Sequence, residues 1–310
     1  MGEKIKYALY LALFMPLAWL PLPVLYLISD GLCFIFHRCL HYRAKVIREN
    51  LAASFPEKSA DELASIEKEF YRQLSDNIVE SIKLLSISTS SIRRRVIVEN
   101  AALVEEAAAT GAPVFLYLGH YCNWEWVPSI TLHFTSPEVT AQIYKPLRDH
   151  AFDRLMLRIR SRFNALNIPQ SKAFRTLLGL SRKGSFIVGI LDDHSPNHSR
   201  SRHFMNFLNH PGTIINVGAE EIGNRLNARY LYLDVEKLKR GHYRLTFKPI
   251  EPTEADGESY PVSHAYMRML EATIRRQPPY WLWSHKRWRY TLSDPRLTQS
   301  DTSPQTTKSE

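Results

Sequence analysis

A histidine and a glutamate with four residues between them stand directly after a run of apolar residues. His120 and Glu125 follow the segment 113–118, which reads Pro-Val-Phe-Leu-Tyr-Leu. An imidazole beside a carboxylate can take a proton from a hydroxyl group, because the carboxylate fixes the tautomer of the ring and favours its charged form. The pattern therefore indicates a general base and its orienting acid at the end of a buried strand.

The spacing alone does not bring these two side chains together. On a regular helix, five positions at about 100° per residue would place them about 140° apart. They can meet only where the chain turns, and Gly119 and Asn123 favour a turn from strand to helix with the glutamate in the first helical turn. We expect Glu125 to bind one ring nitrogen of His120 while the other faces a substrate hydroxyl. The alternative is a histidine that is hydrogen-bonded at a strand end and has no catalytic role.

The composition leaves the function open but limits the compartment. A chain of 310 residues with 45% hydrophobic residues can bury a substantial core. Its 40 Lys and Arg against 31 Asp and Glu indicate a negatively charged partner, which could be nucleic acid, an anionic membrane or an acidic substrate, although a solvated basic surface is the simpler alternative. Three cysteines are too few for a disulfide framework, so a reducing compartment fits better.

The N-terminal segment has the composition of a membrane helix. After Lys4 and Lys6, no charged side chain occurs from position 7 to position 28, and roughly 20 apolar residues suffice to cross a bilayer. Three prolines in this stretch, at positions 16, 21 and 23, should kink it, so a re-entrant or tilted segment is an alternative. A cleavable signal peptide is another, but no small-residue cleavage site follows.

Basic residues are concentrated on the C-terminal side of this segment. They are Arg38, Arg43, Lys45 and Arg48. By the positive-inside rule this side faces the cytoplasm, and the rest of the chain follows it there. We therefore divide the chain into a membrane anchor (1–36), a catalytic domain (37–292) and a disordered tail rich in Ser, Thr, Gln and Asp (293–310).

Apolar strands alternate with helices along the domain. A break at 50–56 is followed by a capped helix from about Ser59 to Leu85. Further expected helices are 100–109, a basic stretch within 144–164, 177–181 and 263–276, and the expected strands are 113–118, 185–191, 228–235 and 243–249. This alternation predicts an α/β fold with a central sheet covered by helices on both sides.

Several short blocks, taken together, resemble a known family. They are Arg48-Glu49-Asn50-Leu51 with Ser54-Phe55-Pro56-Glu57, Gly119-His120-Tyr121-Cys122-Asn123-Trp124-Glu125-Trp126, Tyr144-Lys145-Pro146, Asp193-His194-Ser195-Pro196, Phe207-Leu208-Asn209, Gly218-Ala219-Glu220, and Pro279 to Trp288. In this order they are similar to the late acyltransferases of lipid A biosynthesis, within the lysophospholipid-acyltransferase superfamily. The resemblance spans residues 5–290, and Cys122 replaces the usual glycine of the active-site block.

The resemblance implies a mixed central sheet of the glycerol-3-phosphate acyltransferase type and a reaction without a cofactor. A fatty acyl chain would pass from acyl carrier protein, or from another acyl thioester, to a hydroxyl of a lipid A precursor at the inner membrane. His120 would deprotonate that hydroxyl and Glu125 would orient the histidine, without an acyl-enzyme intermediate. Lys145, then Arg148, would stabilise the oxyanion or bind phosphate, although a solvated basic helix face is the alternative for both. Asn123 would bind the substrate, and Asp193 would bind or orient the acceptor or hold the basic residues in place.

Two other groups of residues invite a different chemistry. Cys122 lies two positions from the histidine, but no partner pattern of a cysteine hydrolase is present, so we expect a packed, unreactive thiol. Four histidines at positions 194, 198, 203 and 210 match no common zinc spacing, and we expect no metal. The polar loop 195–202 would instead cover the site or face the phosphates of the acceptor.

The basic surplus then has a ready explanation in acyl carrier protein, lipid phosphates and the anionic membrane face. No nucleic-acid-binding module is present, so we expect no nucleic-acid partner. Three alternatives stay open. They are an O-acyltransferase acting on a lysophospholipid, glycolipid or aminolipid, a membrane-anchored binding protein without catalysis, and a basic nucleic-acid-binding protein.

Overall fold

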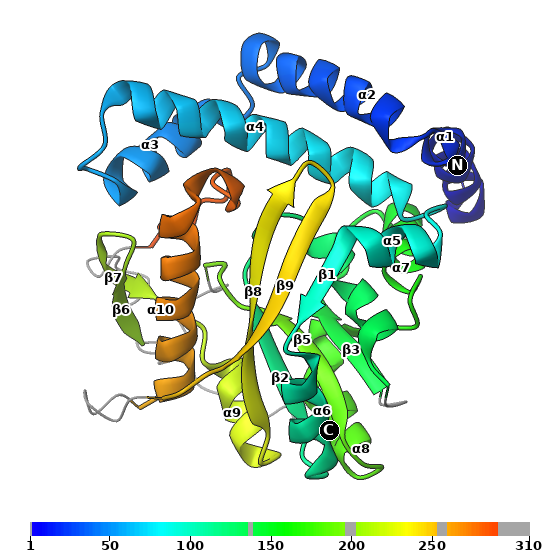
Figure 1. The fold of residues 1–310 in the computed structure, drawn as a ribbon, viewed down its shortest axis with the longest axis vertical. Helices are drawn as coiled ribbons and strands as arrows, with labels where there is room; N and C mark the ends of the chain where they lie inside the picture. Colours follow the sequence, from blue (N-terminus) through cyan, green and yellow to red (C-terminus); the bar gives the residue numbers. More distant parts are fainter. Residues whose placement is uncertain (1, 136–138, 196–202, 253–258, 291–310) are drawn as a thin grey trace, which may run out of the picture.

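The computed structural model describes residues 2–135, 139–195, 203–252 and 259–290, and its centre is a seven-stranded sheet (Figure 1). The strand order is β1-β9-β8-β2-β5-β3-β4. The strands are β1 (Val96–Glu99), β2 (Val114–Leu118), β3 (Val139–Tyr144), β4 (Leu166–Pro169), β5 (Phe186–Leu191), β8 (Arg229–Lys239) and β9 (His242–Pro249). The predicted α/β fold with a mixed central sheet flanked by helices is confirmed.

The middle of the sheet is parallel. β2 pairs in parallel with β5 and β8, and β3 pairs in parallel with β5 and β4, whereas β9 runs antiparallel to β8. Every residue of β2 is buried, which explains why its sequence is a continuous apolar run rather than an alternating one. Leu118 pairs with Leu191, so the segments that follow β2 and β5 leave the sheet side by side. At this carboxyl edge, ligands of parallel α/β sheets commonly bind.

Helices lie on both sides of this sheet (Figure 1). α10 (Pro261–Arg276) packs on β8, and α6 (Ala101–Ala109) packs on β2 and β9. The long α4 (Ala60–Lys83) crosses the upper end of the sheet, above the tip of the β8–β9 hairpin. The remaining elements are α3 (Ala44–Ser54), α5 (Thr89–Arg95), the 3-10 helix η2 (Trp124–His133), α7 (His150–Arg160), η3 (Gln170–Lys172), α8 (Ala173–Ser181), the hairpin β6 (Phe204–Phe207) with β7 (His210–Ile214), α9 (Gly218–Arg225) and η5 (Pro278–Tyr280).

The apolar N-terminal segment is two helices rather than the single one predicted over positions 7–28. α1 (Glu3–Trp19) ends before Pro21, and α2 (Leu22–Phe34) begins after it and continues as the π-helix η1 (Ile35–Cys39). Leu20 precedes a proline and is extended, with ψ 144°. A proline restricts its predecessor in this way and has no N–H to donate to the preceding turn. Within the described residues, the one helix long and apolar enough to cross a membrane is Leu22–Cys39.

Both N-terminal helices pack on the domain with one face. α1 lies against α7 and α4, and α2 lies against α4. Their outer faces expose large apolar side chains, at Ile5, Leu9, Leu13, Trp19, Val24, Leu27, Phe34 and Ile35. The segment therefore adds an apolar outer surface to the domain.

Most of the expected helices and strands are present, with shifted ends. The predicted break at 50–56 begins only at Phe55, because α3 continues to Ser54 and Pro56 then prevents further helix. The basic stretch within 144–164 is helical from His150 to Arg160. The predicted tail from 293 onward and most of the polar loop 195–202 lie outside the described residues.

Candidate active site

The chain turns sharply after β2, as Gly119 and its surroundings require. A Cβ at Gly119 would come within 2.5 Å of Leu270 Cδ1, so any larger residue would force the Leu270 side chain on α10 to move. Cys122 has a φ of 52°, in the left-handed region that favours glycine. Its N–H donates to the Tyr280 carbonyl, 2.9 Å away. Its thiol is buried and burial raises the thiol pKa, so it is the packed, unreactive cysteine that we predicted.

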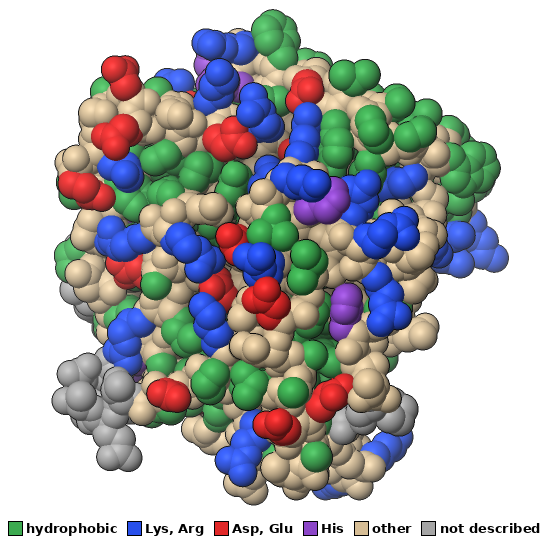
Figure 2. Space-filling view, viewed as in Figure 1, with side chains coloured by type: hydrophobic (Ala, Val, Ile, Leu, Met, Phe, Trp, Pro, Cys, Tyr) green, Lys and Arg blue, Asp and Glu red, His purple; other side chains and the backbone are tan. Residues whose placement is uncertain are grey.

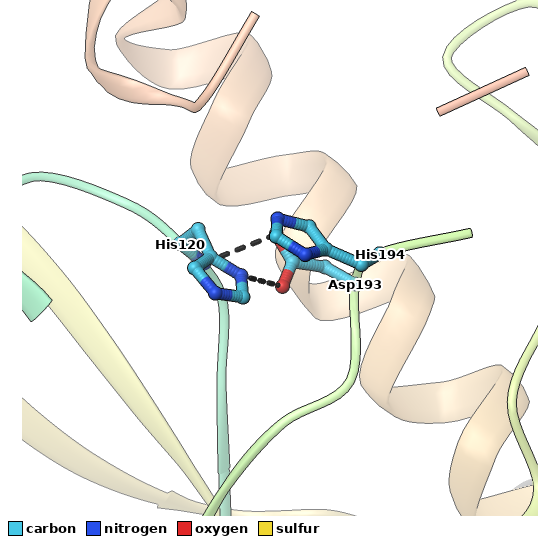
Figure 3. A group of neighbouring side chains, drawn as sticks. All are labelled: His120, Asp193 and His194. Atoms are coloured by element: carbon cyan, nitrogen blue, oxygen red, sulfur yellow. Dashed lines mark hydrogen bonds and ion pairs between the residues drawn. The ribbon is translucent and has the colours of Figure 1, made fainter. Parts of the chain in front are cut away.

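The turn brings His120 to Asp193, which follows β5. The ring Nδ1 lies 2.6 Å from Asp193 Oδ1, and the backbone N–H of His120 donates to Oδ2 over 3.0 Å (Figure 3). Trp281 Nε1 donates to the same Oδ2 over 2.8 Å. Burial alone would raise the pKa of Asp193, but the positive charge and hydrogen bond of His120 hold it well below its usual range. A charged, fully buried carboxylate therefore orients the ring and leaves Nε2 as the second nitrogen.

Glu125 does not contact His120 as the spacing predicted. It lies in the first turn of η2 and takes both carboxylate oxygens to Arg160, at the end of α7, over 2.6 and 2.9 Å. This two-pronged pairing satisfies the glutamate elsewhere. The expected contact is therefore corrected, because Asp193 occupies the position beside the histidine that we assigned to Glu125.

Two further histidines stack on His120. The ring of His194 lies 3.7 Å from that of His120 at 6°, and the ring of His285 lies 4.0 Å from that of His194 at 11°. Burial, together with the charge of His120, lowers the pKa of His194 to about 3. Burial and then Arg287, against the opposing effect of Asp193, lower the pKa of His285 to about 4. Both added rings are neutral at pH 7.

The same residues include a set of candidate metal ligands. Three residues, His120, Asp193 and His194, each offer one possible ligand atom, and these three atoms lie within 4.8 Å of one another. An imidazole nitrogen binds a metal in the plane of its ring, and the two rings are parallel planes, 3.7 Å apart. One ion cannot lie close to both planes, so this arrangement fits a pair of stacked histidines better than a metal centre.

Asn123 is part of a buried network that holds the motif against α4. Its Nδ2 donates to Glu80 over 2.6 Å, and its Oδ1 accepts the Glu125 N–H over 3.1 Å. Glu80 also accepts from Tyr243 and Tyr26, at 2.8 and 2.9 Å. Burial raises the pKa of Glu80. Both polar ends of the Asn123 amide are used inside the protein, which gives this residue a positioning role in place of the predicted contact with substrate.

The comparison with known proteins covers nearly the whole chain. Residues 3–290 match the bacterial lipid A biosynthesis acyltransferase family. The chain belongs to this family. It is 24% identical over 276 residues to the lipid A biosynthesis palmitoleoyltransferase of Escherichia coli (strain K12), an alignment of 87% of this chain and 86% of the relative. The lipid A biosynthesis acyltransferase of Shigella flexneri matches with the same values. The predicted acyltransferase function in lipid A biosynthesis is confirmed.

In this acyltransferase, the two predicted cations Lys145 and Arg148 lie just beyond β3. Both side chains are exposed. Since β3 is parallel to β5, they lie at the same edge of the sheet as His120 and Asp193. No hydrogen bond or ion pair ties either side chain to the part of the chain that the structure describes, so both are free to meet a substrate.

An apolar cavity of about 30 Å³ adjoins the motif of the acyltransferase. It lies between η2 and the sheet, and its lining includes Leu118, Trp124, Val127, Ala141 and Gly189. Leu118 and Trp124 flank the turn that carries His120. An apolar pocket here suits a hydrocarbon chain.

Sequence reasoning missed the partner of Glu125 and the role of the stacked rings. Arg160 was one of several basic residues in its segment, and only its place at the end of α7 distinguishes it. His194 directly follows Asp193, which was a usable indication, but His285 comes from a distant block and nothing in its spacing points to His120.

Proposed function

We propose that this acyltransferase moves a fatty acyl chain from acyl carrier protein to a hydroxyl of a lipid A precursor at the cytoplasmic face of the inner membrane. The single observation that supports this most is the short bond from His120 Nδ1 to the buried Asp193. It fixes the tautomer in which Nε2 is the free base.

In the proposed reaction, Nε2 of His120 takes the proton of the acceptor hydroxyl as its oxygen attacks the thioester carbonyl carbon. The tetrahedral intermediate then collapses, the C–S bond breaks, and the leaving thiolate takes the proton back from the imidazolium. Asp193 stabilises the imidazolium between the two transfers. The neutral rings of His194 and His285 add no positive charge beside it.

Negative charge that develops on the carbonyl oxygen needs a donor, and exposed cations supply the candidates. Lys145 and Arg148 lie at the correct edge of the sheet without partners among the described residues. Glu125 acts indirectly in this proposal. Its ion pair with Arg160 holds η2 against α7, and η2 follows the turn that carries His120. The acyl chain would begin in the cavity beside Leu118.

The proposed acyl donor is supported by the net charge of the chain, and the proposed location by its N-terminal surface. Acyl carrier protein is acidic, and the chain carries a formal charge of +9. The exposed apolar face of α1 and α2 suits contact with a bilayer, and the basic residues after them favour the cytoplasmic side.

The test is an assay of the purified full chain with a tetra-acylated lipid A precursor and acyl carrier protein that carries a labelled acyl chain as its thioester. We expect one added acyl chain on the precursor by mass spectrometry and none with His120→Ala, while His150→Ala, a change of an exposed histidine on α7, retains activity. Transfer to another lipid in place of the precursor would refute the acceptor, and an active His120→Ala would refute the base.

A further inference from the structure

A second concave site lies outside the active site, between α2, η1, α4 and the tip of the β8–β9 hairpin. Its volume is about 550 Å³. One wall is formed by Asp30, Phe34 and Arg38, and α4 forms another with Lys68 and Arg72. We call it the hairpin groove. Nothing in the reaction proposed above uses it.

The groove is strongly basic. Six Lys or Arg side chains line it against two carboxylates. Two of the cations are held in place by other residues of the protein. Arg240 pairs with Asp76 and Asp30 over 2.6 and 2.7 Å. Lys237 donates a hydrogen bond to Gln73 over 2.6 Å. Their positions are thereby fixed before any ligand arrives.

Three other cations are available to a ligand. Arg38, Lys68 and Lys239 are exposed, and none of them makes an ion pair with a residue that the structure describes. They lie on three different walls of the groove, in η1, α4 and the hairpin. Cations that converge from separate elements on one cavity provide a site for a compact anion such as a phosphate group.

The groove adjoins the apolar outer face of α2. Phe34 belongs to both, and the exposed side chains of Leu27, Ile35 and Leu40 continue the apolar surface beyond it. Figure 2 shows basic side chains gathered beside the apolar ones that run along the upper edge of the molecule, over α1 and α2. A ligand that fills the groove therefore meets both charge and hydrocarbon, which is the composition of a lipid.

Two adjacent residues of one segment contact the groove and the active site. The ring of Tyr280 lines the groove, with Lys237 Nζ 4.9 Å from its centre. The next residue, Trp281, donates to Asp193. The residues that line the groove include neither His120 nor Asp193, so a group bound in the groove is not the reacting group.

We propose that the hairpin groove binds the phosphate headgroup of an anionic membrane phospholipid, with its acyl chains along the outer face of α2. This binding needs no acyl transfer and does not depend on the reaction proposed above. A soluble acidic protein fits less well, because the available cations face into a cavity of headgroup size and border on exposed apolar side chains. The bound lipid would fix the height of the catalytic edge at the membrane surface.

The experiment measures binding of short-chain lipids to the full chain in a neutral detergent by native mass spectrometry. We expect dihexanoyl phosphatidylglycerol to remain bound and dihexanoyl phosphatidylcholine to be lost. The double variant Lys68→Glu/Lys239→Glu should weaken phosphatidylglycerol binding at least about tenfold, since each basic residue near an anionic lipid contributes about 1 kcal/mol. The control Arg182→Glu/Lys183→Glu, an equal change of charge beyond α8 at the other end of the molecule, should bind as the unchanged protein does.

Three results would overturn the proposal. One is equal retention of the two lipids, and another is equal loss of binding in the control variant. Glycerol 3-phosphate bound as tightly as phosphatidylglycerol would identify a soluble phosphate site instead. An inactive chain that still binds the anionic lipid would leave this inference intact and count against the proposed reaction, so the two failures are distinguishable.

Discussion

The carboxylate that contacts His120 lies 73 positions away in the chain, not five. Strand pairing explains the difference, because β2 and β5 end in register and release His120 and Asp193 at the same point. Glu125 is closer in sequence, but η2 turns its side chain toward α7. The sequence motif thus contains the histidine of this pair, while the carboxylate comes from the neighbouring strand.

Replacement of Asp193 tests this assignment. In Asp193→Asn the amide cannot stabilise the imidazolium and favours the wrong tautomer of His120, so kcat should fall about 10³-fold or more. Binding of the precursor should change little. The measurement is steady-state acyl transfer, with circular dichroism to show that the variant is folded. A kcat within about threefold of the unchanged protein would contradict the pairing.

Glu125 and Arg160 should behave as one unit. Either Glu125→Gln or Arg160→Gln leaves the other charge without its partner in a largely buried place, at a cost of about 2 kcal/mol of folding free energy. The double variant should cost less than the two single changes together, which thermal unfolding in detergent can measure. If Glu125 instead acts on the base directly, Glu125→Gln would abolish transfer while Arg160→Gln would not, and the two stabilities would add.

At the scale of the elements, local sequence patterns predicted the helices and strands. Contacts between segments that are distant in the sequence determine which residues meet in the site. The capping box of α4 was visible in Ser59 and Glu62, and both of its hydrogen bonds are present. β2 and β5 followed from their apolar runs. The break at Pro21 was underestimated, because three prolines can kink a membrane helix or end a helix in water and the sequence does not distinguish these outcomes.

The cavity beside β2 leads to a prediction about chain length. A methyl group at Gly189 would meet no atom closer than 3.8 Å, so Gly189→Ala should fold normally and narrow the cavity. If the acyl chain enters there, the preferred donor should become shorter by one or two carbons, as seen from kcat/KM over a series of acyl carrier protein thioesters. Gly179→Ala, on α8 with open space around its Cβ, is the control. An unchanged preference for donor chain length would mean that the acyl chain does not enter this cavity.

At the scale of the whole molecule, the fold could be predicted more fully than the site. The alternation of elements fixed the class of the sheet, because hydrophobic period is a local property. The pairing of Glu125 with Arg160 and the stack of His285 on His194 depend on how distant elements pack. The resemblance had placed Asp193 and His285 in the family blocks, but only the packed structure brings them together with His120.

Partly buried histidines whose pKa values are lowered should make the whole molecule sensitive to acid. Burial, and then the positive charge of Arg287, lower the pKa of His285 to about 4, from about 6.5 in the unfolded chain, despite the opposing effect of Asp193. Between these values the unfolded state binds a proton that the folded state does not, so stability falls as the pH falls from 6.5 to 4. For one such histidine the slope is at most about 1.4 kcal/mol per pH unit.

His285→Phe removes this group and keeps an aromatic ring on His194. The melting temperature of the variant in detergent should therefore decline less than that of the unchanged protein when the pH is lowered from 7 to 5. The decline that remains is due to His194 and His210. Burial also lowers their pKa values, to about 3 and about 4. His150→Phe, at an exposed position, should decline as the unchanged protein does. Equal declines for His285→Phe and the unchanged protein would mean that folding does not lower the pKa of His285, and this prediction would be wrong.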